Sequence, residues 1–433
     1  MAGIEAARFD TSRADFTQTY RVSLLNPRLN GGSKQLDSTT ADVSIVGGAG
    51  HVGLPLGLVF AHKGLDVQLF DINAEALDLI QSGCMPALDD GAEPLLKKAI
   101  DEDRLSFTTD AADVAKAASI VITIGTPVDE FLSPVHKAIQ ACVDDLLPHI
   151  HDGQLIVLRS TVYPGTTDWL HRYFLDARKN VLLAFCPERV VQGKGVREIQ
   201  EMPQIVSGTT PQAVSAASKL FRVIAPEIVE LTPLEAEFGK LFTNAYRYVQ
   251  FAIANEFFTI ANSAGVDYYK VLEGMTHNYP RSQGIAKPGL TAGPCLFKDT
   301  MQLAAFARNQ FNLGHSAMLV NEGLVLYIIE RLNQKYDLSS LTVGLLGMAF
   351  KANSDDIRSS LSYKMKKALM THTKKVLSTD PMVTIDPDLL PLNEVIDRSD
   401  LLILCTPHAE YANLDTQGKP LVDIWNHAGG GII

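Results

Sequence analysis

One short segment of the chain combines a cysteine with two charged residues. Cys295 follows a Gly-Pro pair, and Lys298 and Asp299 lie within four residues downstream. Because Pro294 suits the first turn of a helix, the sequence predicts that Cys295 lies at a helix N-terminus. Exposed N–H groups and the helix dipole favour a thiolate there, and Lys298 adds positive charge one turn later. The segment therefore predicts a nucleophile, although a buried structural cysteine fits the same residues.

A glycine pattern follows the first apolar run of the chain. The β-branched run at 42–46 leads into Gly48-Ala49-Gly50-His51-Val52-Gly53, and a second strand-like run ends in Asp71, 18 residues after Gly53. This is the spacing of a dinucleotide fingerprint, with glycines for a tight turn, for close approach of the pyrophosphate and for helix packing. Asp71 would accept hydrogen bonds from ribose hydroxyls and repel a 2′-phosphate. The pattern predicts NAD rather than NADP.

Threonines follow two later strand-like runs. The run 119–124 leads into Gly125-Thr126-Pro127, and the run 155–159 is followed closely by Thr161. Ligands of doubly wound sheets bind beyond the carboxyl ends of the strands. We therefore expect both hydroxyl groups near the cofactor, although a helix cap or a turn explains each threonine equally well.

An acid and a base stand side by side after another apolar run. The run 181–185 ends in Cys186 and Pro187, and Glu188 and Arg189 come next. A charged pair at a strand end beside a proline indicates a site. A solvated ion pair in a loop accounts for the same residues.

Apolar residues recur at helical spacing from Thr232 to about Ala264, and Thr232 with the following proline is a typical helix start. Since this helix exceeds the usual length, we expect it to connect two domains and to take part in dimerisation. Glu237, Lys240 and Asn244 share one face at i, i+3 and i+7. That face predicts either a site that holds a reacting oxygen or a water, or a solvated surface.

A second strand-and-glycine start occurs at 342–347. It lacks the complete GxGxxG pattern, so we do not expect it to bind a second dinucleotide in the same way. Later strand-like segments at 376–381 and 400–407 complete a second nucleotide-type domain. Lys351 and Arg358 are its candidate basic contacts for another nucleotide.

Composition limits the classes of function. The 433 residues suffice for several domains. We expect a flexible extension at 1–40, an NAD-binding domain at 41–228, a central helical domain at 229–336 and a nucleotide-binding domain at 337–433. A net charge of −11 argues against nucleic-acid binding. The five widely spaced cysteines and the absence of a long apolar run predict a cytoplasmic protein with no metal and no membrane contact.

Taken together, these motifs resemble the UDP-glucose/UDP-N-acetylmannosamine dehydrogenase family of nucleotide-sugar dehydrogenases. The resemblance covers about Val43 to Asn426, and it depends on the order of motifs that are weak singly. The motifs are Gly48-Ala49-Gly50-His51-Val52-Gly53, Gly125-Thr126-Pro127, Ser160 through Thr167, Pro187-Glu188-Arg189, Lys240 with Asn244, Asn255-Glu256, Gly293-Pro294-Cys295 through Asp299, and Phe350-Lys351 through Arg358. The resemblance implies an α/β fold with two Rossmann-like doubly wound domains joined by a long central helix. It also implies a C-terminal domain that binds UDP, and a homodimer or higher homo-oligomer.

The resemblance implies a four-electron oxidation of a sugar C6 alcohol to a carboxylate with two NAD⁺. Cys295 would attack the intermediate aldehyde, a second hydride transfer would give a thioester, and water would hydrolyse it. Lys240 would stabilise the oxyanion, and Asn244 and Asp299 would position water or relay its proton. Glu188 would be the base for thioester hydrolysis.

The resemblance also implies contacts for both ligands. The implied NAD contacts are Gly48, Gly50, Val52, Gly53, Asp71, Thr126, Thr161, Lys298 and Arg358. The implied substrate contacts are Glu188, Arg189, Lys240, Asn244, Arg281, Gly293 and Lys351. Arg281 would reach the substrate of a neighbouring subunit, and Lys351 would lie near the UDP. Such basic residues concentrate positive charge for a diphosphate in an acidic chain.

The sugar is indicated by smaller features. Pro187-Glu188-Arg189 and Met85-Pro86-Ala87 resemble the N-acetylhexosamine branch, whereas Pro294 departs from the histidine often found there, and Gln192 replaces a carboxylate. We expect UDP-N-acetylmannosamine or UDP-N-acetylglucosamine as substrate, and a hexosaminuronate for polysaccharide biosynthesis as product. The alternatives are a UDP-glucose 6-dehydrogenase, a two-electron β-hydroxyacid-type dehydrogenase and a non-catalytic NAD-binding sensor.

Overall fold

An eight-stranded sheet organises the N-terminal part of the protein. The structure is a computed structural model that describes residues 41–126, 136–290, 293–429 and 433, so the predicted extension at 1–40 lies outside the described residues. The strand order is β3-β2-β1-β4-β5-β6-β7-β8, and neighbouring strands are parallel except β6 and β7. The strands are β1 (Val43–Val46), β2 (Val67–Phe70), β3 (Leu105–Thr108), β4 (Ser119–Ile122), β5 (Leu155–Leu158), β6 (Leu182–Phe185), β7 (Gln204–Gly208) and β8 (Ile228–Glu230).

Helices cover both faces of this sheet, which explains why its central strands are apolar without alternation. In β1, Val43 and Ile45 pack with α1 and α3, whereas Val46 packs with α5 and α6 on the other face. The helices are α1 (Gly53–His62), α2 (Ala74–Gln81), α3 (Ala92–Asp101), α4 (Ala111–Val114), α5 (His136–Leu146), α6 (Thr166–Asp176), α7 (Gly195–Glu201) and α8 (Pro211–Phe221). The prediction of a doubly wound domain is confirmed, but the antiparallel strand β7 was not predicted.

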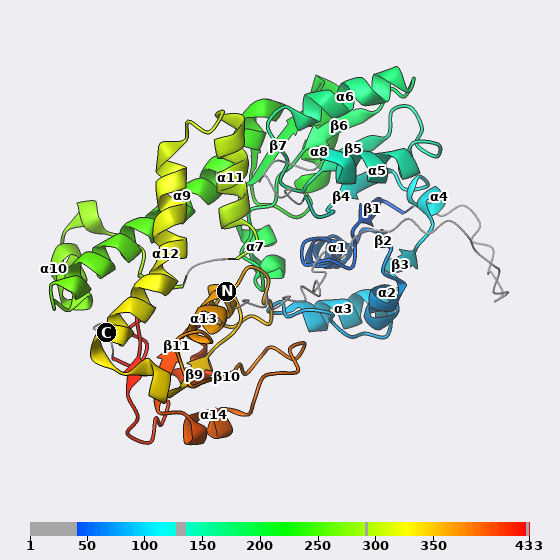
Figure 1. Ribbon diagram of the computed structural model, residues 1–433. Coiled ribbons are helices and arrows are strands. Elements are labelled where there is room, and N and C mark those ends of the chain that lie inside the picture. The colour runs from blue at the N-terminus through cyan, green and yellow to red at the C-terminus, as the bar shows by residue number, and fades with distance from the viewer. Residues whose placement is uncertain (1–40, 127–135, 291–292, 430–432) are drawn as a thin grey trace, which may run out of the picture. The chain divides into compact units, whose positions relative to one another are not determined.

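A long helix, α9 (Pro233–Ser263), follows the first sheet, as the sequence predicted. Pro233 occupies its first turn, and the Glu235 carboxylate accepts a hydrogen bond from the Thr232 N–H, which completes a capping box. Helices α10 (Tyr268–Thr276), α11 (Leu296–Phe306) and α12 (Asn312–Lys335) come next. Figure 1 shows α9, α11 and α12 side by side, and each of the three contacts the other two.

A four-stranded parallel sheet of order β10-β9-β11-β12 forms the C-terminal part. Its elements are β9 (Thr342–Leu346), α13 (Leu361–Leu369), β10 (Lys375–Thr379), α14 (Leu392–Arg398), β11 (Leu401–Leu404) and β12 (Leu421–Val422). One face packs on α12, α13 and the end of α9, and the other packs on α14. The second nucleotide-type sheet is therefore confirmed.

Two searches of the described residues bear on partners. None of their helices combines the length and the apolarity that a bilayer crossing requires. Their His, Cys, Asp and Glu side chains form no group of three that could hold a metal ion.

Candidate active site

The glycine-rich loop lies between β1 and the start of α1. Gly47 has a φ of +82°, so Gly47 makes the left-handed turn, one residue before Gly48, the first glycine of the predicted fingerprint. A larger residue does not fit at Gly48 for a different reason: a Cβ there would lie 2.9 Å from the Cα of Leu69. A Cβ on Gly53 would lie 2.2 Å from the Gly47 carbonyl oxygen, which confirms its packing role. Gly50 is exposed, so its backbone is open to a ligand at the N-terminus of α1.

Asp71 follows β2 and faces this loop. Its Oδ2 accepts a hydrogen bond from Ala49 N at 3.1 Å, and its Oδ1 accepts one from Asn73 N at 3.0 Å. The side chain is half-buried, and each oxygen keeps a lone pair for a further donor. A glycine cradle that a Cβ would fill, with an acid beside it, fits the adenosine half of a dinucleotide.

The ends of β4 and β5 contact the helix that carries the cysteine. Thr126 Oγ1 donates a hydrogen bond to the Thr161 carbonyl oxygen at 2.6 Å. Lys298 Nζ lies 3.2 Å from the Thr126 carbonyl oxygen and 3.3 Å from its Oγ1. Three of the predicted cofactor contacts therefore meet at one place, although Pro127 of the same motif lies outside the described residues. The Thr126 hydroxyl therefore has a structural role, because its hydrogen bond joins the ends of β4 and β5 whether or not a ligand is bound.

Asp299 joins α11 to α9. Its fully buried carboxylate accepts a hydrogen bond from Asn244 Nδ2 at 2.5 Å through Oδ2, and its Oδ1 lies 3.1 Å from Lys298 Nζ. Oδ1 has no partner with hydrogen-bond geometry within the described structure, so one buried lone pair remains available. The predicted group of Asn244, Lys298 and Asp299 is thus assembled around one carboxylate.

Cys295 is the N-cap residue of α11 and is exposed, in the position that the sequence predicted. Loss of hydration against the surrounding protein raises the pKa of its thiol, and the charge of Asp299 raises it further. Lys298, Lys240 and Arg358 lower the pKa without reversing the shift. Lys298 therefore favours the thiolate, but loss of hydration and the charge of Asp299 outweigh its effect on the thiol pKa in the protein alone.

Two residues of the predicted α9 trio differ sharply in environment. Lys240 is half-buried and has no hydrogen bond or ion pair with any described residue, so its ammonium can meet a ligand. Glu237 is fully buried and accepts hydrogen bonds from Gly165 N, Thr167 N and Thr167 Oγ1 at 2.6 to 2.8 Å. Burial raises the pKa of Glu237. Glu237 therefore caps the N-terminus of α6 and is not part of the site.

Glu188 is held in a fixed position. One carboxylate oxygen pairs with Arg159 Nη2, and the other accepts hydrogen bonds from Arg189 N at 2.7 Å and Val190 N at 2.9 Å. Arg159 itself is 1 % exposed and lies over the Phe221 ring. Sequence reasoning missed Arg159, although a charged residue that ends an apolar strand was a usable signal. With both oxygens occupied, Glu188 orients the loop, and its predicted role as a base requires this pair to open.

The loop between β9 and α13 brings a basic cluster toward the first domain. Lys351 Nζ hydrogen-bonds to the Gln192 carbonyl oxygen. Burial lowers the pKa of Lys351, and the charges of Lys194 and Arg247 lower it as well. Arg247 was not predicted, but it follows Asn244 by three residues on the same helix face. The cluster offers several cations to one anionic ligand.

The same loop contacts the segment before Cys295. Gly293 is buried with a φ of +106°, and a Cβ on it would lie 2.6 Å from Phe350. Arg358 pairs with Asp356 and lies close enough to Cys295 to lower its pKa. Arg281 is exposed in a 3₁₀ turn and has no polar partner among the residues that the structure describes, so the structure does not join it to the site.

Comparison with known proteins identifies the family. Three models of the UDP-glucose/GDP-mannose dehydrogenase family match: its NAD binding domain at residues 41–225, its central domain at 234–323 and its UDP binding domain at 344–428. The UDP-N-acetyl-D-mannosamine dehydrogenase of Pyrococcus horikoshii is 30% identical over 393 residues, which cover 86% of this chain and 92% of that protein. An NDP-N-acetyl-D-galactosaminuronic acid dehydrogenase of Ralstonia nicotianae is 28% identical, with 90% of this chain and 97% of that protein covered.

A solved structure shows the same architecture. The UDP-D-ManNAc dehydrogenase structure from Pyrococcus horikoshii superposes with a TM-score of 0.81 at 27% identity, and covers 88% of this chain and 93% of its own. The motifs, the fold and the three matched domains agree. This chain belongs to the UDP-glucose/GDP-mannose dehydrogenase family and is an NAD-dependent nucleotide-sugar dehydrogenase.

Proposed function

We propose that this enzyme oxidises the C6 alcohol of a UDP-N-acetylhexosamine to the uronate, through a thiohemiacetal and a thioester on Cys295. The observation that carries the proposal is the placement of Cys295 at the start of α11. A hydrogen bond between Asn244 and Asp299 joins that helix to α9. A second one, between Lys298 and the Thr126 carbonyl oxygen, joins it to the end of β4, where the cofactor is expected. A thiol, an unpaired ammonium and a buried carboxylate would then surround one reacting carbon.

The sugar class is supported by two kinds of evidence. The Pro-Glu-Arg loop resembles the N-acetylhexosamine branch, and the two relatives above are named for N-acetyl-D-mannosamine and N-acetyl-D-galactosaminuronic acid. We favour UDP-N-acetylmannosamine or UDP-N-acetylglucosamine. Lys351 and Arg247 would bind the diphosphate, because guanidinium and ammonium groups are the usual partners of phosphate oxygens.

The chemistry needs a nucleophile, a cation and a proton acceptor. NAD⁺, held by the glycine-rich loop, Asp71 and the ends of β4 and β5, would accept one hydride in each of the two oxidations. Cys295 Sγ would bond to C6 of the aldehyde, and the Lys240 ammonium would stabilise the negative charge on the C6 oxygen. Asp299 Oδ1, which accepts no hydrogen bond from a described residue and lies 3.1 Å from Lys298 Nζ, would accept a proton from the water that hydrolyses the thioester.

The thiol must lose its proton as it attacks, since its pKa is raised. Lys240 and Arg358 favour the thiolate, and desolvation and Asp299 oppose it. We therefore propose that the thiol loses its proton as Sγ attacks the bound aldehyde, and that this proton passes to the C6 oxygen to give the thiohemiacetal.

We also propose that the enzyme is at least a homodimer. α9 carries a row of exposed apolar side chains at helical spacing: Phe242, Tyr246, Ile253, Phe257 and Ile260. A second copy of the chain that covers this row would remove it from water. Arg281, which is exposed, would then be available to a substrate in the partner subunit.

The test measures NADH formed per sugar for a panel of UDP-sugars. We expect two NADH per UDP-N-acetylmannosamine or UDP-N-acetylglucosamine, and loss of at least about 1,000-fold of uronate formation in Cys295→Ala, since a covalent step is removed. Cys84→Ala is the matched control, because Cys84 is the other exposed cysteine among the described residues. One NADH per sugar would favour a two-electron oxidation. Turnover of UDP-glucose but of no UDP-N-acetylhexosamine would make the enzyme a UDP-glucose 6-dehydrogenase instead.

A further inference from the structure

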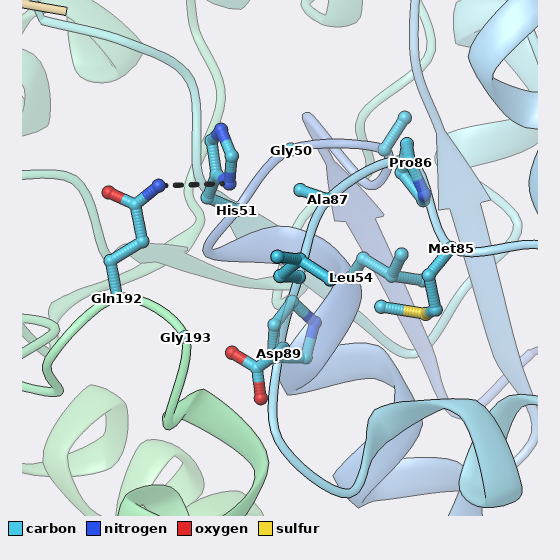
Figure 2. Close-up of a pocket in the computed structure, with 12 residues that line it drawn as sticks. Gly50, His51, Leu54, Met85, Pro86, Ala87, Asp89, Gln192 and Gly193 are labelled. Carbon is cyan, nitrogen blue, oxygen red and sulfur yellow. Dashed lines mark hydrogen bonds between the residues drawn. The ribbon is translucent and has the colours of Figure 1, made fainter. Parts of the chain in front are cut away.

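Gln192 lies where three segments of the enzyme meet. Its side-chain Nε2 is 3.3 Å from His51 Nδ1 of the glycine-rich loop and 3.0 Å from Asp356 Oδ2 of the β9–α13 loop. Its backbone carbonyl accepts a hydrogen bond from Lys351 Nζ. Figure 2 shows the amide pointing at the His51 ring, beside a pocket that Gly50, Pro86, Asp89 and other residues line.

The chemistry of this position requires an amide. A primary amide nitrogen carries two N–H donors, and here one meets an imidazole nitrogen and the other a carboxylate. The reversed amide would place Oε1 against Asp356, with two acceptors face to face. A glutamate would offer no proton to either neighbour and would repel the Asp356 carboxylate. Both hydrogen bonds therefore depend on glutamine at 192.

The two partners of the amide belong to different ligand sites. His51 is in the loop that begins α1, where a dinucleotide pyrophosphate binds. Asp356 is 4 % exposed and holds Arg358 through Nε at 3.0 Å and Nη2 at 2.7 Å. Lys351, in the same loop, belongs to the cluster assigned to the nucleotide of the substrate. One side chain therefore joins the cofactor loop to the substrate loop.

We propose that Gln192 is a positioning residue that couples these two loops, so that NAD and a uridine nucleotide bind with positive cooperativity. The inference rests on the proposed use of a UDP-sugar. Each ligand holds its own loop in the arrangement that makes the shared hydrogen bonds, so the second ligand meets a loop that is already placed. Coupling of this kind is reciprocal, because each ligand changes the affinity for the other by the same factor.

The experiment measures NAD⁺ affinity by calorimetry with and without saturating UDP, in the full chain. In the unmodified enzyme we expect UDP to lower the Kd for NAD⁺ at least fivefold, within the usual range of coupling between sites. In Gln192→Ala and in the nearly isosteric Gln192→Glu, we expect the effect of UDP to fall below twofold. The reverse titration, UDP with and without NAD⁺, gives the same factor.

The control variant is Gln200→Ala. Gln200 lies on α7, and its one side-chain hydrogen bond with a described residue goes to the Val196 carbonyl oxygen of its own helix, so we expect the fivefold coupling to stay. Independent binding of the two ligands in the unmodified enzyme overturns the proposal, and so does coupling that survives both Gln192 variants. Turnover of UDP-sugars without coupling overturns this proposal alone, whereas failure to bind NAD⁺ or UDP at all overturns the proposed function with it.

Discussion

The two sheets of this enzyme begin in the same way. In the first, β1 runs into Gly47 with a φ of +82°, and in the second, β9 runs into Gly347 with a φ of +89°. In both, the strand beside the first one ends next to an aspartate, Asp71 after β2 and Asp380 after β10. Both aspartates accept backbone N–H groups of the segment after the glycine. The starting geometry of a nucleotide-binding unit is therefore present twice.

The two aspartates then differ in what they bind. Asp71 is half-buried and accepts two N–H groups. The side chain of Asp380 has no exposed surface, and it accepts Met348 N, Ala349 N and His408 Nε2 on Oδ2 and two further N–H groups on Oδ1. A half-exposed carboxylate with unused lone pairs can accept hydrogen bonds from ribose hydroxyls. A buried carboxylate whose two oxygens already accept protein donors stabilises the fold instead. Because both oxygens of Asp380 are occupied, we expect this acid to leave no acceptor for a ribose.

The segments after the two glycines diverge accordingly. In the first sheet α1 begins at Gly53, so that its N–H groups face the ligand site. In the second, α13 does not begin until Leu361, and the loop between β9 and α13 presents Lys351 and Arg358 instead. The first site would therefore bind phosphate through backbone N–H groups, and the second through cationic side chains.

The largest effect on NAD⁺ affinity is expected from Gly53→Ala. The new Cβ would lie 2.2 Å from the Gly47 carbonyl oxygen, so the loop and the helix must separate. We expect NAD⁺ affinity to fall at least about 100-fold, about 2.8 kcal/mol. Calorimetric titration measures it, with Gly274→Ala as control because a Cβ there meets nothing within 4 Å. Binding within threefold of the unmodified enzyme would show that tight helix packing is not what shapes the cofactor site.

Asp380→Asn tests the other aspartate. An asparagine has one acceptor oxygen, so wherever its NH₂ group points it faces at least two N–H donors and leaves them unpaired. We expect the C-terminal domain to lose about 3 kcal/mol of unfolding free energy, since each unsatisfied buried donor costs about 1–3 kcal/mol. Affinity for NAD⁺ should stay unchanged.

The chain has two tryptophans, Trp169 in the first domain and Trp425 in the second, so Trp169→Phe leaves a single reporter of the C-terminal domain. Urea unfolding in this background measures the loss. The control is Asp388→Asn, because Asp388 is exposed. A loss no larger than that of Asp388→Asn would mean that the N–H groups around Asp380 find other acceptors.

Low pH should destabilise the C-terminal domain by protonating the Asp380 carboxylate. Burial alone would raise the pKa of Asp380, but His408 and the backbone N–H groups outweigh it and lower the pKa from 3.8 to about 2. Because the folded-state pKa is depressed, the stabilisation is complete above pH 3.8 and is lost as the pH falls through about 2. We expect it to be worth about 2 kcal/mol. The difference in unfolding free energy between the unmodified enzyme and Asp380→Asn, followed by Trp425 fluorescence from pH 6 to 2, should shrink below pH 4, and a constant difference would contradict this.

Local patterns predicted much of this molecule because local chemistry determines it. The glycine spacing with Asp71, the cap at Thr232 and the N-terminal position of Cys295 all depend on residues near each other in sequence. The sheets followed from apolar runs and their order. Edge strands such as β8, with mostly exposed residues, carry a weaker signal and were not predicted.

Long-range partners account for the errors. Helical spacing put Glu237 beside Lys240, but it could not show that the N-terminus of α6 would lie against Glu237 and occupy it. Arg159 was missed because its partner Glu188 lies 29 residues away, across a strand. The net rise in the thiol pKa of Cys295 was not predicted because its largest cause is loss of hydration, which depends on how the folded chain surrounds the thiol. These are properties of packing rather than of pattern.

Asp71→Asn should give the smallest effect and the sharpest contrast. Asparagine keeps an acceptor for Ala49 N, and the exposed Asn73 N can hydrogen-bond to water, so we expect no measurable loss of stability. NAD⁺ affinity should weaken about tenfold as one charged hydrogen bond to the ribose is lost. Removing the negative charge should also narrow the preference for NAD⁺ over NADP⁺, because the carboxylate no longer repels a 2′-phosphate. Titrations with both dinucleotides, beside urea unfolding, measure these effects. If Asp71→Asn instead destabilised the enzyme as Asp380→Asn does and left NAD⁺ affinity intact, both aspartates would serve the fold, and the difference between the two sheets would have to lie in their loops alone.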